Sequence, residues 1–136
     1  MTLHVEVVSP ERVLWSGEGS MVIARTLGGG DIAFLTGHAP FVGALDAGKV
    51  TIRPDDGDDI LVAVHGGFAE VSNDRVTILS DVAELTDQID VARAQTALET
   101  AEGALRTDAT DAEALAAKRR AEVRLEVAGG APAAAH

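Results

Sequence analysis

Cysteine and tyrosine are absent from this chain of 136 residues, and aromatic residues make up only 3% of it. Without cysteine the chain can form no disulfide framework, no thiolate metal site and no cysteine nucleophile. Because aromatic side chains are so few, the core that a hydrophobic content of 46% permits must be built from valine, isoleucine, leucine and alanine. The length suits one ordinary domain or two small units.

Basic residues are also scarce, since 11 lysines and arginines face 22 acidic residues and the formal net charge is -11. This balance disfavours binding to nucleic acid or directly to anionic lipid headgroups, both of which require a basic surface. No stretch approaches the roughly 18 apolar residues of a membrane-spanning helix, and the N-terminus lacks the pattern of a signal peptide. We therefore expect a cytosolic chain, which can still belong to a membrane-bound complex.

The first part of the chain, up to residue 83, consists of short apolar or alternating segments separated by turn residues. Turns are expected at 46–48 and 66–67, and Asn73-Asp74 is typical of a β-hairpin. The segments predict strands at 3–8, 13–15, 21–27, 32–35, 41–45, 49–53, 60–64, 68–71 and 75–79. Many short strands at this spacing favour an antiparallel β-sandwich or flattened barrel.

Helical periodicity replaces this alternation in the last third of the chain. The two faces it predicts are Val91, Ala94, Leu98, Ala101 and Leu105, then Ala114, Ala117, Ala121 and Leu125. We expect Asp87 to cap the first helix, and Thr110 with Glu113 to form a capping box on the second. The fold class is therefore α+β, with a sandwich over 1–84, an antiparallel two-helix hairpin over 85–136 and a loose tail from about 129.

Alanine dominates both faces of this hairpin. It is the best helix former but buries little apolar area, so we expect stable helices that pack weakly on each other and on the sandwich. The hairpin is a candidate moving part, although a static decoration fits the pattern equally well.

No motif combines the residues that catalysis or a metal centre needs. The four histidines, among them His65 and His136, have no metal-binding spacing. His65-Gly66-Gly67 resembles an esterase oxyanion turn without the Gly-x-Ser-x-Gly elbow. The glycines at 28–30 lack the rest of a P-loop, and the acidic cluster at 55–59 lacks EF-hand spacing. We expect no catalytic residue, no metal site and no enzymatic activity.

Four segments match one family in order and spacing. They are Leu14-Trp15-Ser16-Gly17-Glu18, the run from Gly30 to Pro40, Gly66 to Val71 with Val76 to Leu79, and Ala83-Glu84 with Ile89-Asp90-x-x-Arg93-Ala94. Together they cover nearly the whole chain and resemble the epsilon subunit of bacterial F-type ATP synthases. Ala33 and Thr36 depart from the glycine and proline usual in that family, which leaves the detail of the turn at 36–40 open.

The resemblance implies a rotor subunit of the central stalk. In such complexes the sandwich binds the gamma subunit and the membrane c-ring and rotates with them, which couples proton flow to ATP synthesis in the catalytic alpha/beta head. The chain itself would perform no chemistry, and it would lie at the cytoplasmic face of the cell membrane, held there only through the complex. Its hairpin would fold down beside the sandwich or extend into the head and inhibit ATP hydrolysis.

The resemblance also implies two sites. Asp31 and His38, with the turn around them, would face the polar loops of the c-ring, although His38 could equally serve a local hydrogen bond. No cofactor would be required, but regulatory ATP would bind through Glu84, Ile89, Asp90, Arg93, Ala94, Arg120 and Arg124. ATP binding is not universal in the family, and Arg93 could instead pair with Asp90 or Glu84.

Arginine suits phosphate because its planar fork donates two hydrogen bonds, and Arg120 and Arg124 share one helix face. With Lys118 and Arg119 they would form a basic stripe that could meet an acidic surface of a catalytic subunit. The alternative is a solvated face balanced by nearby glutamates.

Two other classes of protein remain as alternatives. One is a stand-alone β-sandwich that binds a small ligand under a helical lid. The other is an enzyme that uses His65 with an acidic partner such as Glu70. A pull-down from solubilised membranes would separate both from a stalk subunit.

Overall fold

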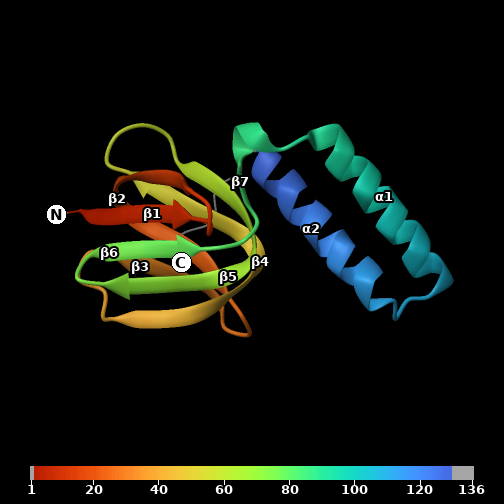
Figure 1. Cartoon of the computed structure of the whole chain (residues 1–136), viewed down its shortest axis with the longest axis horizontal. Coiled ribbons are helices and arrows are strands. Elements are labelled where there is room, and N and C mark those ends of the chain that lie inside the picture. Colours follow the sequence, from red (N-terminus) through yellow and green to blue (C-terminus); the bar gives the residue numbers. More distant parts are fainter. Residues whose placement is uncertain (1, 130–136) are drawn as a thin grey trace.

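The computed structural model describes residues 2–129, which form a β-structure followed by two helices (Figure 1). The strands are β1 (Leu3–Val8), β2 (Val13–Thr26), β3 (Gly30–Leu35), β4 (Phe41–Pro54), β5 (Ile60–Ser72), β6 (Arg75–Leu79) and β7 (Ala83–Leu85). A 3₁₀ turn η1 (Thr86–Gln88) leads to α1 (Val91–Thr107) and α2 (Ala112–Ala128). Neither helix is long and apolar enough to cross a membrane, as judged over the described residues.

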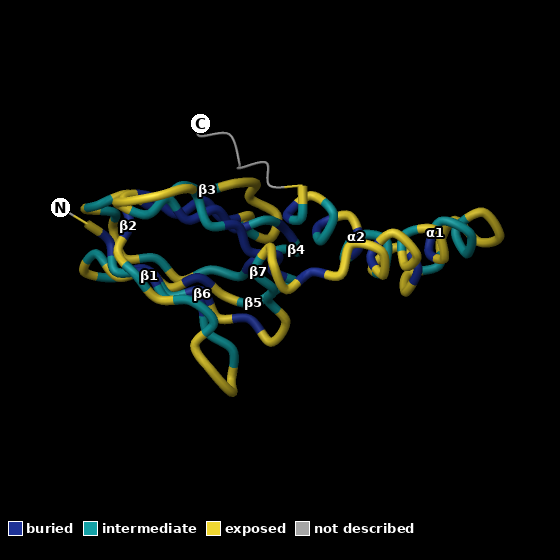
Figure 2. The backbone as a smooth tube through the Cα atoms, turned by 90° about the horizontal axis from the view of Figure 1, so that it is seen from above, coloured by how far each residue is buried: buried dark blue, intermediate teal, exposed yellow. Residues whose placement is uncertain are grey.

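The strands form two facing layers (Figure 2). Their order is β1-β6-β5-β4-β2-β3, β7 is added to β5, and β1 also pairs with β2, which closes the sheet on itself. The predicted sandwich is therefore confirmed. One pairing departs from the expected antiparallel pattern, because β1 runs parallel to β6.

Large aliphatic side chains from both layers fill the space between them. The alternation in β1 places Leu3, Val5 and Val7 fully inside, as period-two patterning requires. Phe34 of β3 is also fully buried, and it is among the largest side chains of the core. The other core residues are Val22, Ala24, Leu45, Val50, Ile52, Val62, Val64, Ala69, Val71, Val76 and Ile78.

Several expected strand breaks are wrong, because β2, β4 and β5 are long. Residues 46–48 stay extended inside β4, since Ala47 pairs with His65 and Gly48 with Val64 of β5. Cross-strand pairing here overrides a local turn preference. The bend at 66–67 is instead an irregularity within β5, where Gly66 and Gly67 have φ of 89° and 128°. A side chain on Gly67 would collide with the carbonyl oxygen of Leu79.

The turn and cap predictions had mixed outcomes. Asn73 and Asp74 have φ of 51° and 59°, which confirms the tight hairpin turn between β5 and β6. Both predicted helix caps are wrong. Asp90 caps α1 by accepting from Arg93 N at 3.0 Å, and Asp111 caps α2 by accepting from Ala114 N at 3.1 Å.

The expected residues are displaced by a few positions because neighbouring aspartates compete for the same role. Asp87 lies in η1, one turn too early to cap α1. Thr110 donates its hydroxyl to Asp108 instead of capping α2. Gly129 caps the end of α2, and the rest of the expected tail lies outside the described residues.

The helix pair projects from one end of the sandwich (Figures 1 and 2). Helix α2 makes the main contacts with β4 and β5, whereas α1 packs chiefly on α2. The interface between the helices is lined by buried alanines, namely Ala94, Ala101, Ala114 and Ala121. The hairpin is therefore attached to the sandwich mainly through one of its two helices.

Candidate functional site

A cleft of about 370 Å³ lies where the two helices meet β7 and η1. Its walls are formed by Glu84, Gln88, Asp90, Arg93, Ala94, Ala97, Ala117, Arg120 and Arg124. We call this space the helix cleft. The small alanine side chains where the helices pack together leave this space open, and acidic and basic side chains surround it.

The structure brings together six of the seven residues expected at an ATP site, which are Glu84, Asp90, Arg93, Ala94, Arg120 and Arg124. Ile89 is not among them, because it is buried in the contact between the hairpin and the sandwich. The sequence reasoning missed Gln88, Ala97 and Ala117. Helical spacing could have found the two alanines, since Ala97 follows Arg93 by one turn and Ala117 precedes Ala121 by one turn.

The arginines of the helix cleft differ in their partners. Arg124 Nε lies 2.6 Å from Glu84 Oε1, and Arg120 Nη2 lies 3.1 Å from Glu113 Oε1. Arg93 is exposed, and within residues 2–129 its guanidinium has no ion-pair partner, so the suggested pairing with Asp90 or Glu84 is not formed. Only the backbone N–H of Arg93 contacts the Asp90 carboxylate. The cleft thus presents one unengaged cation and two that a ligand must share with carboxylates.

The end of α2 docks on the sandwich through five apolar side chains. This docking cluster consists of Leu61, Ala63, Ile89, Val123 and Val127. Three polar links surround it. Lys49 Nζ lies 3.1 Å from Glu126 Oε1, Arg119 Nη2 donates to the carbonyl of Ala47 at 2.8 Å, and Arg124 pairs with Glu84.

The basic residues of α2 do not form the single stripe that was expected. Arg119 and Arg124 turn toward the sandwich, where both have partners. Arg120 faces the helix cleft, and Lys118 lies beside Glu102 and Arg106 of α1. In the docked hairpin these cations are divided among three surfaces because a helix turns about 100° per residue.

His65 lies beside Glu84 and Arg124, and only 4% of its side chain is exposed. Burial, followed by the charge of Arg124, lowers the pKa of this imidazole. Glu70 is exposed further along β5, opposite Val42, so the two residues of the enzyme alternative are not brought together. No cluster of three or more metal-ligating side chains occurs in the described part of the chain.

Asp31 and His38 lie near opposite ends of β3. Asp31 is the second residue of that strand, and Arg25 Nε donates to its carboxylate at 3.2 Å. His38 follows the strand, its Nδ1 lies 2.7 Å from the carbonyl oxygen of Ala39, and its ring packs on Phe34. The expectation that both lie in one turn is therefore wrong for Asp31, and the local hydrogen bond suggested for His38 is formed.

A further exposed surface lies on the outer face of β4, β5 and β6. Phe68 is 54% exposed and is paired with Leu79, and Val42 of β4 is 73% exposed two positions from the residue that pairs with Phe68. We call Val42, Phe68 and Leu79 the outer apolar patch. Contiguous exposed apolar side chains of this kind mark contact surfaces.

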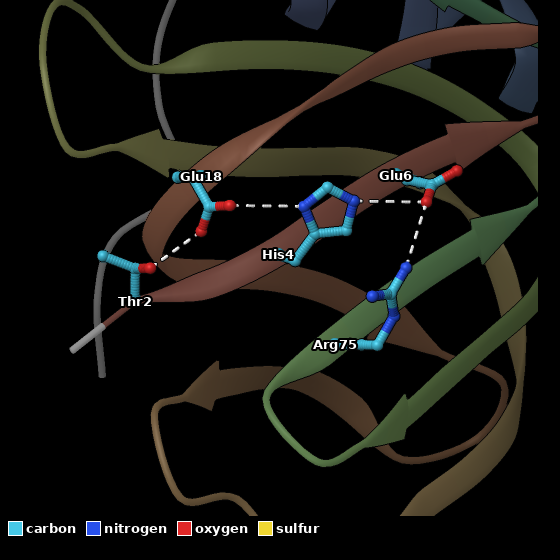
Figure 3. Close-up of polar contacts among 5 residues, drawn as sticks. All are labelled: Thr2, His4, Glu6, Glu18 and Arg75. Atoms are coloured by element: carbon cyan, nitrogen blue, oxygen red, sulfur yellow. Dashed lines mark hydrogen bonds and ion pairs between the residues drawn. The ribbon is translucent and has the colours of Figure 1, made fainter.

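A polar network links β1 to the strands on either side of it (Figure 3). His4 of β1 lies between two carboxylates, with Nε2 3.2 Å from Glu6 and Nδ1 3.4 Å from Glu18. Thr2 donates to Glu18 at 2.7 Å, and Arg75 of β6 lies 3.5 Å from Glu6. The bonds from Thr2 and His4 lower the pKa of the Glu18 carboxyl. The network therefore ties β1 to both of its neighbouring strands.

Comparison with known proteins connects this architecture to one family. Residues 2–86 match the family model described as ATP synthase, Delta/Epsilon chain, beta-sandwich domain. The chain is 49% identical over 123 residues to the ATP synthase epsilon chain of Streptomyces griseus, an alignment that covers 90% of this chain and 92% of that one. The chain belongs to the family of ATP synthase epsilon chains.

More distant relatives agree over the full length. Identity to the epsilon chain of Thermobifida fusca is 45%, with 97% of this chain and 96% of the relative covered, and identity to that of Synechococcus elongatus is 39%. The fold is similar to a chain in a Euglena gracilis mitochondrial ATP synthase structure that contains OSCP, F1 and the c-ring. That similarity has a TM-score of 0.70 at 22% identity, and it covers 94% of this chain and 78% of the other.

Family membership confirms the resemblance seen in the sequence. The relatives are epsilon chains, which belong to the stalk of the synthase and not to its catalytic subunits. The alternatives of a stand-alone ligand-binding protein and of an enzyme are therefore set aside. The roles of particular surfaces on this chain are a separate question.

Proposed function

We propose that the chain couples rotation of the c-ring to the catalytic head as a rotor subunit, and that its hairpin regulates ATP hydrolysis. The observation that carries this proposal is the unequal attachment of the two parts. Residues 2–86 match the family's sandwich domain and have a closed core, whereas α2 is held on that core by a small docking cluster. One part suits a permanent contact in the rotor, and the other suits a contact that is released.

The sandwich, taken as residues 1–84, would bind the gamma subunit through the outer apolar patch. Exposed apolar side chains on a sheet face are stabilised when a partner covers them. A chain ending at residue 86 should therefore still join the complex and couple it. Phe68→Asp should abolish binding to isolated gamma subunit, while Leu27→Asp, at an exposed leucine outside the outer apolar patch, should leave it intact.

The c-ring would contact the sandwich along β3. This strand is last in the sheet order, and Asp31 and His38 mark its two ends. The double variant Asp31→Arg/His38→Ala should assemble and hydrolyse ATP but pump protons poorly. Normal pumping by the variant complex would remove these residues from the contact. Through the c-ring the chain would lie at the cytoplasmic face of the cell membrane without entering the lipid.

The hairpin would inhibit hydrolysis when it leaves the sandwich and enters the alpha/beta head. Release would free Arg119 and Arg124 from their partners on the sandwich and expose them to an acidic surface of the head. Deleting residues 88–136 should therefore raise ATP hydrolysis by the assembled complex. Unchanged hydrolysis after deletion would show that the hairpin does not inhibit.

Regulatory ATP would hold the hairpin in the docked form by binding in the helix cleft. The volume of the cleft is near the lower end of the range for small-molecule sites, and Arg93 is available to phosphate oxygens. Arg120 and Arg124 would also bind the phosphates, each replacing its ion pair with a carboxylate by a contact with phosphate. Asp90 and Glu84 would accept hydrogen bonds from the nucleoside, and Ile89 would act indirectly by keeping η1 in place.

Calorimetric titration of the isolated chain with ATP tests this site. We expect Arg93→Ala to weaken binding strongly, and Arg106→Ala, at another exposed arginine of α1, to have no effect. The absence of heat from the parent chain, or equal binding by the two variants, would exclude the site.

A further inference from the structure

The imidazole of His65 is an exception among the buried polar groups of the described chain. Both ring nitrogens are buried, and neither has a hydrogen-bond partner within residues 2–129. The carboxylate oxygen Glu84 Oε1 lies 3.6 Å from Nε2, which is too far for a hydrogen bond. Burying such a group without a partner costs free energy, so the site stabilises neither form of the ring well.

The surroundings of the ring come from three elements. Within the described residues, Glu84 of β7 is the carboxylate that approaches it, and Arg124 and Arg120 of α2 act on it as cations. Opposite His65, β4 contributes Ala47, and two pairs further along Lys49 is already bonded to Glu126. Among the acids close in sequence to these residues, Asp81 and Asp87 are exposed, and half-buried Asp46 of β4 accepts a hydrogen bond from the backbone N–H of Ala47.

Glu84 cannot fully serve His65 while α2 is docked. Its Oε1 atom is held by Arg124 at 2.6 Å, so a protonated imidazole would be a second cation competing for one carboxylate. It would also lack water, since 4% of the side chain is exposed. Burial and Arg124 accordingly lower the pKa of His65, and Glu84 offsets this only in part.

Release of α2 reverses these conditions. Arg124 and Arg120 leave with the helix, and water reaches the ring. Glu84 remains, because β7 stays paired with β5 through Ala63 and Glu84. A carboxylate freed from its arginine then stabilises the imidazolium beside it.

We propose that His65 is a proton-operated release for the hairpin, in which uptake of one proton by the ring detaches α2 from the sandwich. This role goes beyond inhibition and nucleotide binding, and it needs neither. A rotor subunit of a proton-driven complex would thereby respond to the acidity of the surrounding solution.

The direction of the effect follows from linkage. The docked state binds the proton less tightly than the released state, so docking is fully stable above the released-state pKa, which Glu84 keeps at or above the ordinary histidine value of about 6.5. Its stability falls as the pH decreases below that value and levels off below the docked-state pKa. One proton changes the docking equilibrium by at most about tenfold per pH unit.

Fluorescence energy transfer on the full chain tests the proposal, because the absence of cysteine allows two labels to be placed freely. Labels at Asp58→Cys and Ala116→Cys, both exposed, would report the distance between the sandwich and α2. We expect transfer to fall between about pH 7.5 and about pH 5, around the ordinary histidine range. His65→Phe should abolish this response and keep the high-pH distance, because phenylalanine keeps a ring and loses no hydrogen bond.

His4→Gln is the matched control, since it removes another imidazole, which lies on β1 between Glu6 and Glu18, and its response should equal that of the parent (Figure 3). A pH response that survives in His65→Phe, or no response in the parent, would overturn the proposal. If His65→Phe fails to dock at any pH, the His65 ring signals of the parent decide by nuclear magnetic resonance. A depressed pKa supports the release, and an ordinary value in the docked chain overturns it.

Discussion

The sandwich and the hairpin are both stabilised by aliphatic side chains, but they bury very different amounts of apolar surface. The sandwich encloses Phe34, Leu3 and Ile52 completely. Between the two helices, four buried alanines provide much of the contact, and the docking cluster adds five residues, one of them alanine. Since the hydrophobic free energy scales with buried apolar area, we expect the hairpin to detach at a much lower free-energy cost than unfolding the sandwich requires.

The strongest way to test this comparison is to remove the largest core side chain. Phe34→Ala should destabilise the sandwich by about 3–5 kcal/mol, because Phe34 is fully buried and its loss leaves a cavity. Urea denaturation measures the change. Phe68→Ala is the control, since Phe68 is 54% exposed and its removal should change the free energy of unfolding of the isolated chain little. Equal losses would mean that the core is not where the stability lies.

The sequence predicted the sandwich because its strands alternate, and β1 shows why this worked. Leu3, Val5 and Val7 specify one buried face whatever the partner strand is. The turn predicted inside β4 was wrong, because glycine and aspartate at 46–48 favour a turn only in the absence of a partner strand. Pairing with β5 is a long-range contact that no local pattern contains.

The candidate site was predictable only in part. The spacing of Asp90, Arg93 and Ala94, with Arg120 and Arg124, placed these residues on facing helices, and the structure brings them to one cleft. Spacing could not separate Ile89, which belongs to the docking cluster. It also could not show that Glu84 is bonded to Arg124 and lies beside His65, since that depends on how α2 lies across β7.

A smaller effect is expected from weakening the docking cluster. Val127→Ala should cost about 2 kcal/mol of docking, because two buried methyl groups are removed from a side chain with 0% exposure. Hydrogen exchange should show lost protection in α2 while β5 remains protected. Val91→Ala, at an exposed position of α1, is the control. Loss of protection in both regions together would show that the hairpin and the sandwich form one cooperative unit.

Removing the helix caps should affect the first turns of α1 and α2 to different extents. Asp90→Ala and Asp111→Ala each remove an N-cap carboxylate, which is worth about 1 kcal/mol. Helix α2 contacts the sheet through its C-terminal half, whereas the first turn of α1 closely follows Ile89 of the docking cluster, so the first turn of α2 should fray further than that of α1. Amide exchange of the two first turns measures this difference. Asp87→Ala, at an exposed residue of η1, should leave both turns unchanged.

The ion pair between Lys49 and Glu126 should have the smallest effect. The lysine side chain is 10% exposed and the glutamate 51%, so water screens the pair, and Glu126→Gln should weaken docking by less than about 1 kcal/mol. Added salt should reduce the difference further, since exposed charges are screened over a few ångströms. Glu122→Gln, at an exposed glutamate on the same helix, is the matched control for charge. If Glu126→Gln released the hairpin as completely as Val127→Ala, charge rather than apolar burial would hold it on the sandwich, and the contrast between the two parts would need another physical basis.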